Sequence, residues 1–355
     1  MKENVRRRER TERSEQSFEI IGQEDTDMKI HTIAVMGAGA VGCYFLDGLS
    51  EKFGENLWTV ASGQRAERLK RDGLTVNGRR LALNVRTPEE ARGADLLLVA
   101  VKYGALKPCV DDIEKVVAEH TTVMSLLNGV DSETVIAERI GMEHIVYSMM
   151  KIASERKDNE VVFDPEVTQG VYFGETDRGD SGINAESGES DGRGRNADSG
   201  ESDRRIAAIA EAFEGTKIRY TICDDIIRDI WFKYALNISK NLPQAMVNCG
   251  FGAYTSSEYV AALSRRLEEE VAAVAKAKGI DLSDKNNAAG KNSAISPKAR
   301  FSTLQDLDAG RHTEIDMFSG AMMRMGRELG IPTPYNEFTY YMIKALEEKN
   351  DGLLP

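Results

Sequence analysis

The sequence has little cysteine, no long apolar run and no excess of positive charge. Its four cysteines are scattered, without the paired spacing of a zinc site or a disulfide framework, at Cys43, Cys109, Cys223 and Cys249. No apolar run approaches the roughly 20 residues that cross a bilayer. No apolar stretch with a cleavage site follows the basic segment Arg6-Arg7-Arg8. We therefore expect a cytoplasmic protein with no metal and no membrane partner.

The overall charge is acidic, with a formal net value of -12 at pH 7. A nucleic-acid partner is disfavoured because it would require a basic face. An anionic cofactor stays compatible, since a local group of N–H donors and lysines can outweigh the mean field. The chain has 355 residues, of which 41% are hydrophobic and 29% charged. Length and composition are typical of a soluble globular protein with two domains.

The chain divides into segments of different character. Residues 1–28 are almost all polar or charged, which predicts a disordered extension. Strands are then expected at 30–35, 57–61, 96–101 and 123–127, with helices at 40–53 and 110–120. The strand at 96–101 is continuously apolar, as parallel strands buried on both faces are. Alternating strands and helices predict an α/β fold with a Rossmann-type, doubly wound sheet, the dinucleotide-binding domain of residues 29–224.

The second half of the chain is interrupted once and then becomes helical. Residues 178–203 are nearly free of apolar side chains, so we expect a disordered polar insertion within the first domain. From Asp225 onward, apolar residues recur at helical spacing at 226–241, 257–278, 313–329 and 336–348. The second domain, residues 225–350, is therefore predicted to be mostly α-helical, and to hold the substrate.

A glycine-rich turn joins the first expected strand to the first expected helix: Gly37-Ala38-Gly39-Ala40-Val41-Gly42. In this context the first glycine permits the tight turn, the second lets a pyrophosphate approach, and the third lets helix and strand pack closely. The helix N-terminus offers free N–H groups to phosphate. The turn predicts a nicotinamide dinucleotide cofactor, and the alternative is a glycine-rich turn without a ligand.

The end of the second expected strand bears on the choice between NAD and NADP. NAD-binding proteins usually carry an acid there to hold the ribose 2′-hydroxyl. Here the strand is followed by Ser62-Gly63-Gln64-Arg65, which contains no acid. Ser62 and Arg65 can hold a 2′-phosphate, which favours NADP(H). The alternative for Arg65 is a solvated residue at a helix start.

Polar residues also follow the next two apolar runs. Lys102 comes after Val101, and Asn128 comes after Leu127. Ligands of open α/β sheets bind beyond the carboxyl ends of the strands, so both should face the crevice of the glycine turn. Lys102 can bind a carboxylate or the cofactor, and Asn128 the nicotinamide ribose or the substrate. A solvated lysine and a turn asparagine are the alternatives.

In the helical half, Lys233, Asn237 and Asn241 are spaced at i, i+4 and i+8, along one face of a helix. Such a face either lies in solvent or lines a polar cleft, and periodicity does not separate the two.

Several segments together resemble the ketopantoate reductase (2-dehydropantoate 2-reductase) family. They are the glycine turn, Val101-Lys102, Leu127-Asn128-Gly129, Trp231-x-Lys233 with its two asparagines, and Arg311-His312-Thr313-Glu314-Ile315-Asp316 ahead of Gly330-Ile331-Pro332-Thr333-Pro334. The resemblance runs from about Ile30 to Glu348 and is interrupted by the polar insertion.

The resemblance implies reduction of 2-dehydropantoate to (R)-pantoate with NADPH, a step toward coenzyme A. It implies that Lys233 is the general acid and that the Glu314 carboxylate holds the substrate hydroxyl. It also implies that Asn237 and Asn241 are substrate-binding amides, that Ser302 contacts the substrate carboxylate, and that Asn128 and Lys102 are cleft residues near nicotinamide and substrate. A homodimer would be compatible with it.

The chemistry of these residue types agrees with such roles. Hydride arriving at a ketone carbon leaves charge on oxygen, and an ammonium group stabilises that charge and donates the proton. Without the resemblance, Glu314 is equally typical of a first-turn acid on a helix dipole, with Thr313 as the cap. The segment Leu242-Pro243-Gln244 departs from the family pattern. Reduction of another 2-keto acid, or NADP(H) binding without turnover, is therefore the alternative function.

Overall fold

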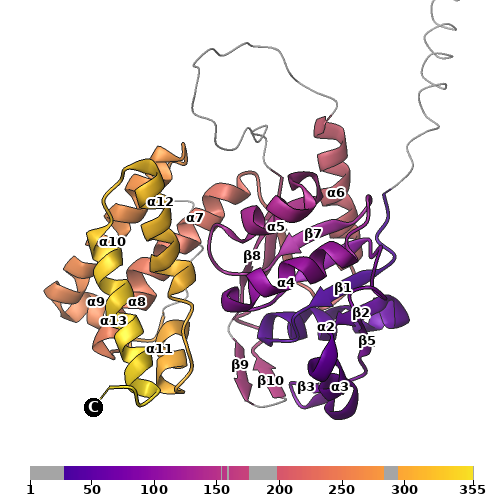
Figure 1. The fold of residues 1–355 in the computed structure, drawn as a ribbon, viewed down its shortest axis with the longest axis horizontal. Helices are drawn as coiled ribbons and strands as arrows, with labels where there is room; N and C mark the ends of the chain where they lie inside the picture. The colour runs from indigo at the N-terminus through magenta and orange to yellow at the C-terminus, as the bar shows by residue number, and fades with distance from the viewer. Residues whose placement is uncertain (1–27, 153, 158–159, 176–197, 284–294, 355) are drawn as a thin grey trace, which may run out of the picture.

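The computed structural model describes residues 28–152, 154–157, 160–175, 198–283 and 295–354. Figure 1 shows two lobes, a sheet flanked by helices and a bundle of helices, with α7 (Ile226–Leu236) at their junction. The predicted α/β fold with a helical C-terminal half is confirmed. Of the predicted extension 1–28 and insertion 178–203, residues 1–27 and 178–197 lie outside the described residues.

The first lobe contains an eight-stranded sheet in the order β12-β11-β8-β7-β6-β1-β2-β5. Neighbouring strands are parallel except β8 and β11, which are antiparallel. The strands are β1 (Ile33–Met36), β2 (Leu57–Val60), β5 (Asn84–Arg86), β6 (Leu96–Val99), β7 (Thr122–Ser125), β8 (Ile145–Lys151), β11 (Gly170–Gly174) and β12 (Tyr220–Ile222).

Strand register brings four strand ends to one edge of this sheet. Met36 pairs with both Val60 and Val99, and Val99 pairs with Ser125. The segments that follow β1, β2, β6 and β7 therefore leave the sheet side by side. This edge is where the sequence places the glycine turn, Ser62, Lys102 and Asn128.

Helices cover both faces of the sheet because β1 is apolar on both. Ile33 and Val35 pack with helices α2 and α6, whereas Ala34 and Met36 pack with α4 and α5. Alternate residues of a strand point to opposite faces, so a strand in this position must be apolar throughout. The helices of this lobe are α2 (Ala40–Phe53), α3 (Gly63–Asp72), α4 (Tyr103–Val116), α5 (Ser132–Ile140) and α6 (Asp198–Phe213), with short 3-10 turns at Gly54–Asn56 and Met142–His144.

A second, four-stranded sheet packs against α2 and is not predicted from the sequence. Its order is β4-β3-β10-β9, with β3 (Leu74–Val76), β4 (Arg79–Leu81), β9 (Ser154–Lys157) and β10 (Glu160–Phe163). Asn77 and Gly78 join β3 to β4, and both have positive φ, at 46° and 78°. An Asn-Gly pair with this geometry makes a two-residue hairpin turn, so the dipeptide was the available signal.

In the described part of the chain after β12, the elements are all helical and enclose a separate apolar core. α10 runs through its centre, with Leu267, Val271 and Val274 fully buried against α7 and the C-terminal helices. The elements are α7, a π-helical turn η3 (Asn237–Asn241), α8 (Leu242–Val247), α9 (Ala253–Ser256), α10 (Glu258–Ala277), α11 (Ser302–Asp308), a second π turn η4 (Asp316–Gly320), α12 (Ala321–Leu329) and α13 (Pro334–Asn350).

Three expectations about these elements were wrong. The predicted insertion 178–203 ends earlier, because α6 begins at Asp198; extending a formed helix by polar residues at its N-terminus costs little. The helix expected at 110–120 is α4, and it includes Pro108 in its second turn, where one lost hydrogen bond is tolerated. The helix expected at 226–241 is interrupted by η3, because Pro243 has no N–H to offer the carbonyl of Ser239.

Candidate active site

Lys233 lies on α7 and reaches across to the sheet lobe. Its Nζ donates to Asn128 Oδ1 at 2.7 Å and to the carbonyl of Met150 at 2.5 Å. Buried neighbours on α7, among them Trp231 and Tyr234, fix the face that the helix turns inward. The ammonium group is thereby held at the carboxyl ends of β7 and β8.

Asn128 connects this lysine to Glu314. Its Nδ2 donates to Glu314 Oε2 over 3.4 Å, while its Oδ1 accepts from Lys233. The buried carboxylate of Glu347 accepts from the backbone N–H and the hydroxyl of Thr313, which fixes the segment that carries Glu314. Three predicted residues from three distant parts of the chain are therefore brought together.

Burial of Lys233 sets its acidity. Removal of the ammonium group from water and the neighbouring positive charge of Lys151 lower the pKa of Lys233, the Glu314 carboxylate opposes both, and the net pKa is about 8. At neutral pH the lysine is still mostly protonated and is a stronger acid than an ordinary ammonium group. A group with this pKa can donate a proton to a developing alkoxide.

Asn237 and Asn241 lie in η3, one turn beyond Lys233. Asn241 Nδ2 donates to Asn237 Oδ1 at 3.4 Å, and Asn241 is buried. The structure brings these two amides together, but no hydrogen bond joins them to Lys233 or Glu314 among the described residues.

Lys102 and Ser302 lie farther out on the same side. Lys102 is 63% exposed and forms an ion pair of 3.6 Å with Asp306 on α11. Ser302 is the exposed first residue of α11, and as residue i to Asp306 at i+4 it shares that helix face. Asp306 also accepts from Arg311 at 2.8 Å. Asp306 was not among the predicted site residues, because nothing in its local sequence distinguishes it from an ordinary surface carboxylate of α11.

A second contact between the lobes flanks Lys233 from the other side. Asp131, in the loop after β7, accepts from the hydroxyl of Tyr103 at 2.7 Å and from Arg324 of α12 at 3.0 Å. Arg324 also donates to the Tyr103 hydroxyl at 2.8 Å. These bonds hold the loop that carries Asn128 against the helical lobe.

The glycine turn has the geometry expected of a phosphate cradle. Gly37 has φ 102°, and a Cβ there would lie 2.6 Å from the carbonyl oxygen of Ala100. A Cβ on Gly42 would lie 1.8 Å from the oxygen of Gly37. Gly39 is the N-cap of α2. The N–H groups of the first turn, which belong to Ala40, Val41 and Gly42, have no hydrogen-bond partners within the helix. With the buried Ala38, these residues leave room for a pyrophosphate at the helix N-terminus.

Ser62 and Arg65 lie at the neighbouring strand end. Ser62 is the N-cap of α3, but its side chain forms no capping hydrogen bond. Arg65 is an exposed residue in the first turn, within electrostatic reach of Cys109 on α4. Both residues follow β2, which pairs with β1, so their segment leaves the sheet at the same edge as the glycine turn.

Lys151 was not among the predicted site residues, although its place at the end of a strand could have indicated it. It ends the apolar run of β8, as Lys102 follows that of β6, and its charge acts on Lys233. Burial lowers the pKa of Lys151, against the opposing effect of Asp229 on α7.

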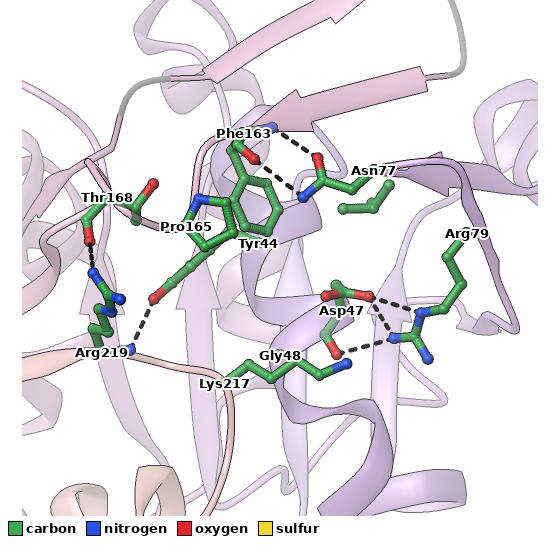
Figure 2. Close-up of a pocket in the computed structure, with 11 residues that line it drawn as sticks. Tyr44, Asp47, Gly48, Asn77, Arg79, Phe163, Pro165, Thr168, Lys217 and Arg219 are labelled. Carbon is green, nitrogen blue, oxygen red and sulfur yellow. Dashed lines mark hydrogen bonds and ion pairs between the residues drawn. The ribbon is translucent and has the colours of Figure 1, made fainter.

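A separate hollow of about 360 Å³ lies behind α2, away from these residues. Figure 2 shows its polar side chains turned toward one another. Asn77 exchanges two hydrogen bonds of 3.0 Å with the backbone of Phe163, Arg79 is paired with Asp47, and Arg219 donates to a backbone carbonyl at 3.1 Å. None of the predicted residues lines this hollow, and its contacts join the small sheet to α2.

Comparisons with known proteins match both lobes. The model of the ketopantoate reductase PanE/ApbA family matches residues 33–178, and that of the ketopantoate reductase PanE/ApbA C-terminal region matches residues 225–347. A 2-dehydropantoate 2-reductase of Mesorhizobium japonicum is 26% identical over 339 residues, which cover 88% of this chain and 97% of the relative.

Solved structures agree with this match. A PanE/ApbA family ketopantoate reductase from Ralstonia eutropha has a TM-score of 0.69 at 26% identity, over 90% of this chain and 99% of the other. D-mandelate dehydrogenase, solved with NADH and anilino(oxo)acetate, has the same fold, with a TM-score of 0.72 at 22% identity over 90% and 99% of the two chains. No described helix is long and apolar enough to span a membrane. Because the two family models together match more than half of its residues, the chain belongs to the ketopantoate reductase family of oxidoreductases.

Proposed function

We propose that this protein reduces 2-dehydropantoate to (R)-pantoate with NADPH and that Lys233 is the general acid. The observation that carries the proposal is the contact of Lys233 with Asn128, which in turn contacts Glu314. These three residues come from the helical lobe, the sheet edge and the segment before η4, and they meet at the sheet edge that also carries the glycine turn.

The residues of the chain have distinct tasks in this reaction. A bound reduced nicotinamide supplies the hydride to the keto carbon. The Lys233 ammonium group stabilises the charge that develops on the keto oxygen and transfers its proton there, leaving a neutral amine that is reprotonated from solvent. Asn128 holds the lysine in place by accepting from it. The Glu314 carboxylate accepts from the substrate hydroxyl, and Asn237, Asn241 and Ser302 bind the rest of the substrate.

The choice of NADPH is supported by the residues at the end of β2. No acid stands there to hold a ribose 2′-hydroxyl, whereas the exposed Ser62 and Arg65 can hold a 2′-phosphate. Cβ atoms at Gly37 and Gly42 would clash with the backbone of Ala100 and Gly37, so the tight turn depends on these glycines, and the helix N-terminus that it forms can hold the pyrophosphate. Lys102, which borders the same edge, can approach the cofactor if it leaves Asp306.

A second candidate is the reduction of a different 2-keto acid. It is favoured by the similar fold of D-mandelate dehydrogenase with NADH, and by the departure at Leu242-Pro243-Gln244 next to the two asparagines. NADP(H) binding without turnover is less well supported, because a protein that only senses the cofactor has no need of the lysine and glutamate pair.

A panel of 2-keto acids, each assayed with NADPH and with NADH, separates these candidates. We expect the highest kcat/KM for 2-dehydropantoate with NADPH. A higher kcat/KM for another 2-keto acid would overturn the substrate and keep the reaction class. Cofactor binding with no oxidation by any acid would overturn the enzymatic function altogether.

A further inference from the structure

A second lysine adjoins Lys233 and has no part in the mechanism above. Lys151 is the last residue of β8, directly after Met150, whose carbonyl accepts from Lys233. Its Nζ lies 4.1 Å from the centre of the Tyr172 ring on β11. Met149, two residues before it, packs on Ile226 and Ile230 of α7. Side chains two apart on a strand share a face, so Lys151 faces the helix that carries Lys233.

The groups around the two lysines leave both ammonium charges incompletely compensated. Among the described residues, neither lysine forms an ion pair. Lys233 donates to an amide and a carbonyl, and Lys151 lies over an aromatic ring. Two carboxylates act at longer range, Asp229 from α7 and Glu314 from the segment before η4. The thiol of Cys223 also acts on Lys151, but burial raises the pKa of this thiol, so it is neutral.

Two half-buried cations without a paired anion are unfavourable unless a ligand supplies the anion. A charge removed from water costs free energy that hydrogen bonds to neutral groups only partly restore. Burial lowers the pKa of both lysines because it makes their charged forms less stable. A carboxylate entering between them would restore it and would also favour the protonated form of Lys233.

We infer that Lys151 is a substrate-binding residue whose ammonium group takes the carboxylate of the 2-keto acid. The inference rests on the proposed function and adds to it a residue that binds the substrate carboxylate. In such a molecule the carboxylate is bonded directly to the keto carbon. A substrate whose keto oxygen meets Lys233 can turn this carboxylate toward Lys151, which directly follows Met150 and whose charge acts on Lys233. Esters and amides of the same acid lack the charge that Lys151 would bind.

The test measures binding and turnover separately, with the holoprotein. Wild type, Lys151→Met and Lys151→Arg are titrated with 2-dehydropantoate in the presence of NADP⁺, following the fluorescence of Trp231, which is buried on α7 near the site. The same proteins are assayed for NADPH oxidation with the acid and with its amide. Lys217→Met is the matched control, because this exposed lysine is paired with Glu51 on the far side of α2. Affinity for NADPH checks that each variant is folded.

We expect Lys151→Met to weaken binding of the acid and raise its KM about 10- to 100-fold, the loss typical of one charge-assisted hydrogen bond. The preference for acid over amide should shrink by the same factor. Lys151→Arg should keep most of the preference, and Lys217→Met should change neither quantity. Unchanged acid binding and an unchanged acid-to-amide ratio in Lys151→Met would overturn this inference alone. Binding of the acid without turnover in wild type would overturn the proposed function alone, and no binding in wild type would overturn both.

Discussion

Replacing Asn128 by aspartate tests whether the acidity of Lys233 controls turnover. The two side chains have nearly the same shape, so the change places a carboxylate oxygen where an amide oxygen now lies 2.7 Å from Lys233 Nζ. An opposite charge this close favours the protonated lysine. Two unit charges at 4 Å interact by about 4 kcal/mol at the effective dielectric of a protein surface. Pairs of this kind shift a pKa by about one to three units.

The expected result is a movement of the alkaline limb of the pH–rate profile. Burial lowers the pKa of Lys233 to about 8 in the wild type, and the reaction needs its protonated form, so kcat should fall as pH rises through about 8. In Asn128→Asp the limb should move upward by about one to three pH units. At pH 7 the rate should be lower, because the lysine is a weaker acid and the new carboxylate repels an anionic substrate.

The assay is NADPH oxidation at saturating substrate from pH 6 to pH 10, with Asn128→Ala as the control. The alanine variant removes the hydrogen bond without adding charge, so its alkaline limb should not move upward. An unmoved limb in the aspartate variant, or the same upward shift in the alanine variant, would refute the assignment of that limb to Lys233.

Three further changes test the fold and the cofactor site. Burial raises the pKa of Glu133 from 4.5 to about 7. The contribution of this carboxyl group to the free energy of unfolding is therefore fully present below pH 4.5 and is lost as pH rises through 7, because ionisation is harder in the folded protein than in the unfolded chain. Glu133→Gln should remove this loss, up to about 3 kcal/mol, in urea unfolding at pH 5 and pH 8; equal pH dependence in both proteins would contradict it. Gly42→Ala should destabilise the protein by about 3 kcal/mol and abolish NADPH binding, because its Cβ would meet the oxygen of Gly37, whereas Gly104→Ala, in open space on α4, should be tolerated. Arg65→Ala should raise the KM for NADPH about tenfold and leave that for NADH nearly unchanged; equal effects on both would argue against a 2′-phosphate contact.

Much of the first lobe follows from local sequence pattern. The bounds of α2, Ala40–Phe53, agree with the prediction. The glycine turn marks where the helix begins, and the apolar residues at helical spacing mark how far it runs. The apolar runs of β1 and β6 predict a buried parallel sheet, since strands covered on both faces are apolar throughout. The small sheet escaped prediction because β3 and β4 have only three residues each, too few to show a period.

The helical lobe shows what periodicity leaves out. It predicts that Lys233, Asn237 and Asn241 share one face, but it does not predict the π turn that Pro243 accompanies. Within that turn, the side chain of Asn241 donates to that of Asn237.

The candidate site depends on contacts between residues far apart in the sequence. The pairs of Lys233 with Asn128 and of Asn128 with Glu314 span 105 and 186 residues, so no local pattern predicts their distances. The strand-end rule directs attention to one edge of the sheet, and the same rule applied to β8 points to Lys151. The homodimer, the cofactor preference and the roles of the site residues stay predictions.

The most direct measurement compares wild type with Lys233→Ala in NADPH oxidation by 2-dehydropantoate, with NADPH affinity measured in parallel. We expect wild type to turn over and the variant to lose about 10²- to 10⁴-fold in kcat, the usual contribution of a general acid, while its affinity for NADPH stays within about threefold. Full kcat in the variant would contradict the role of Lys233, and no oxidation by wild type with any 2-keto acid would contradict the proposed reaction.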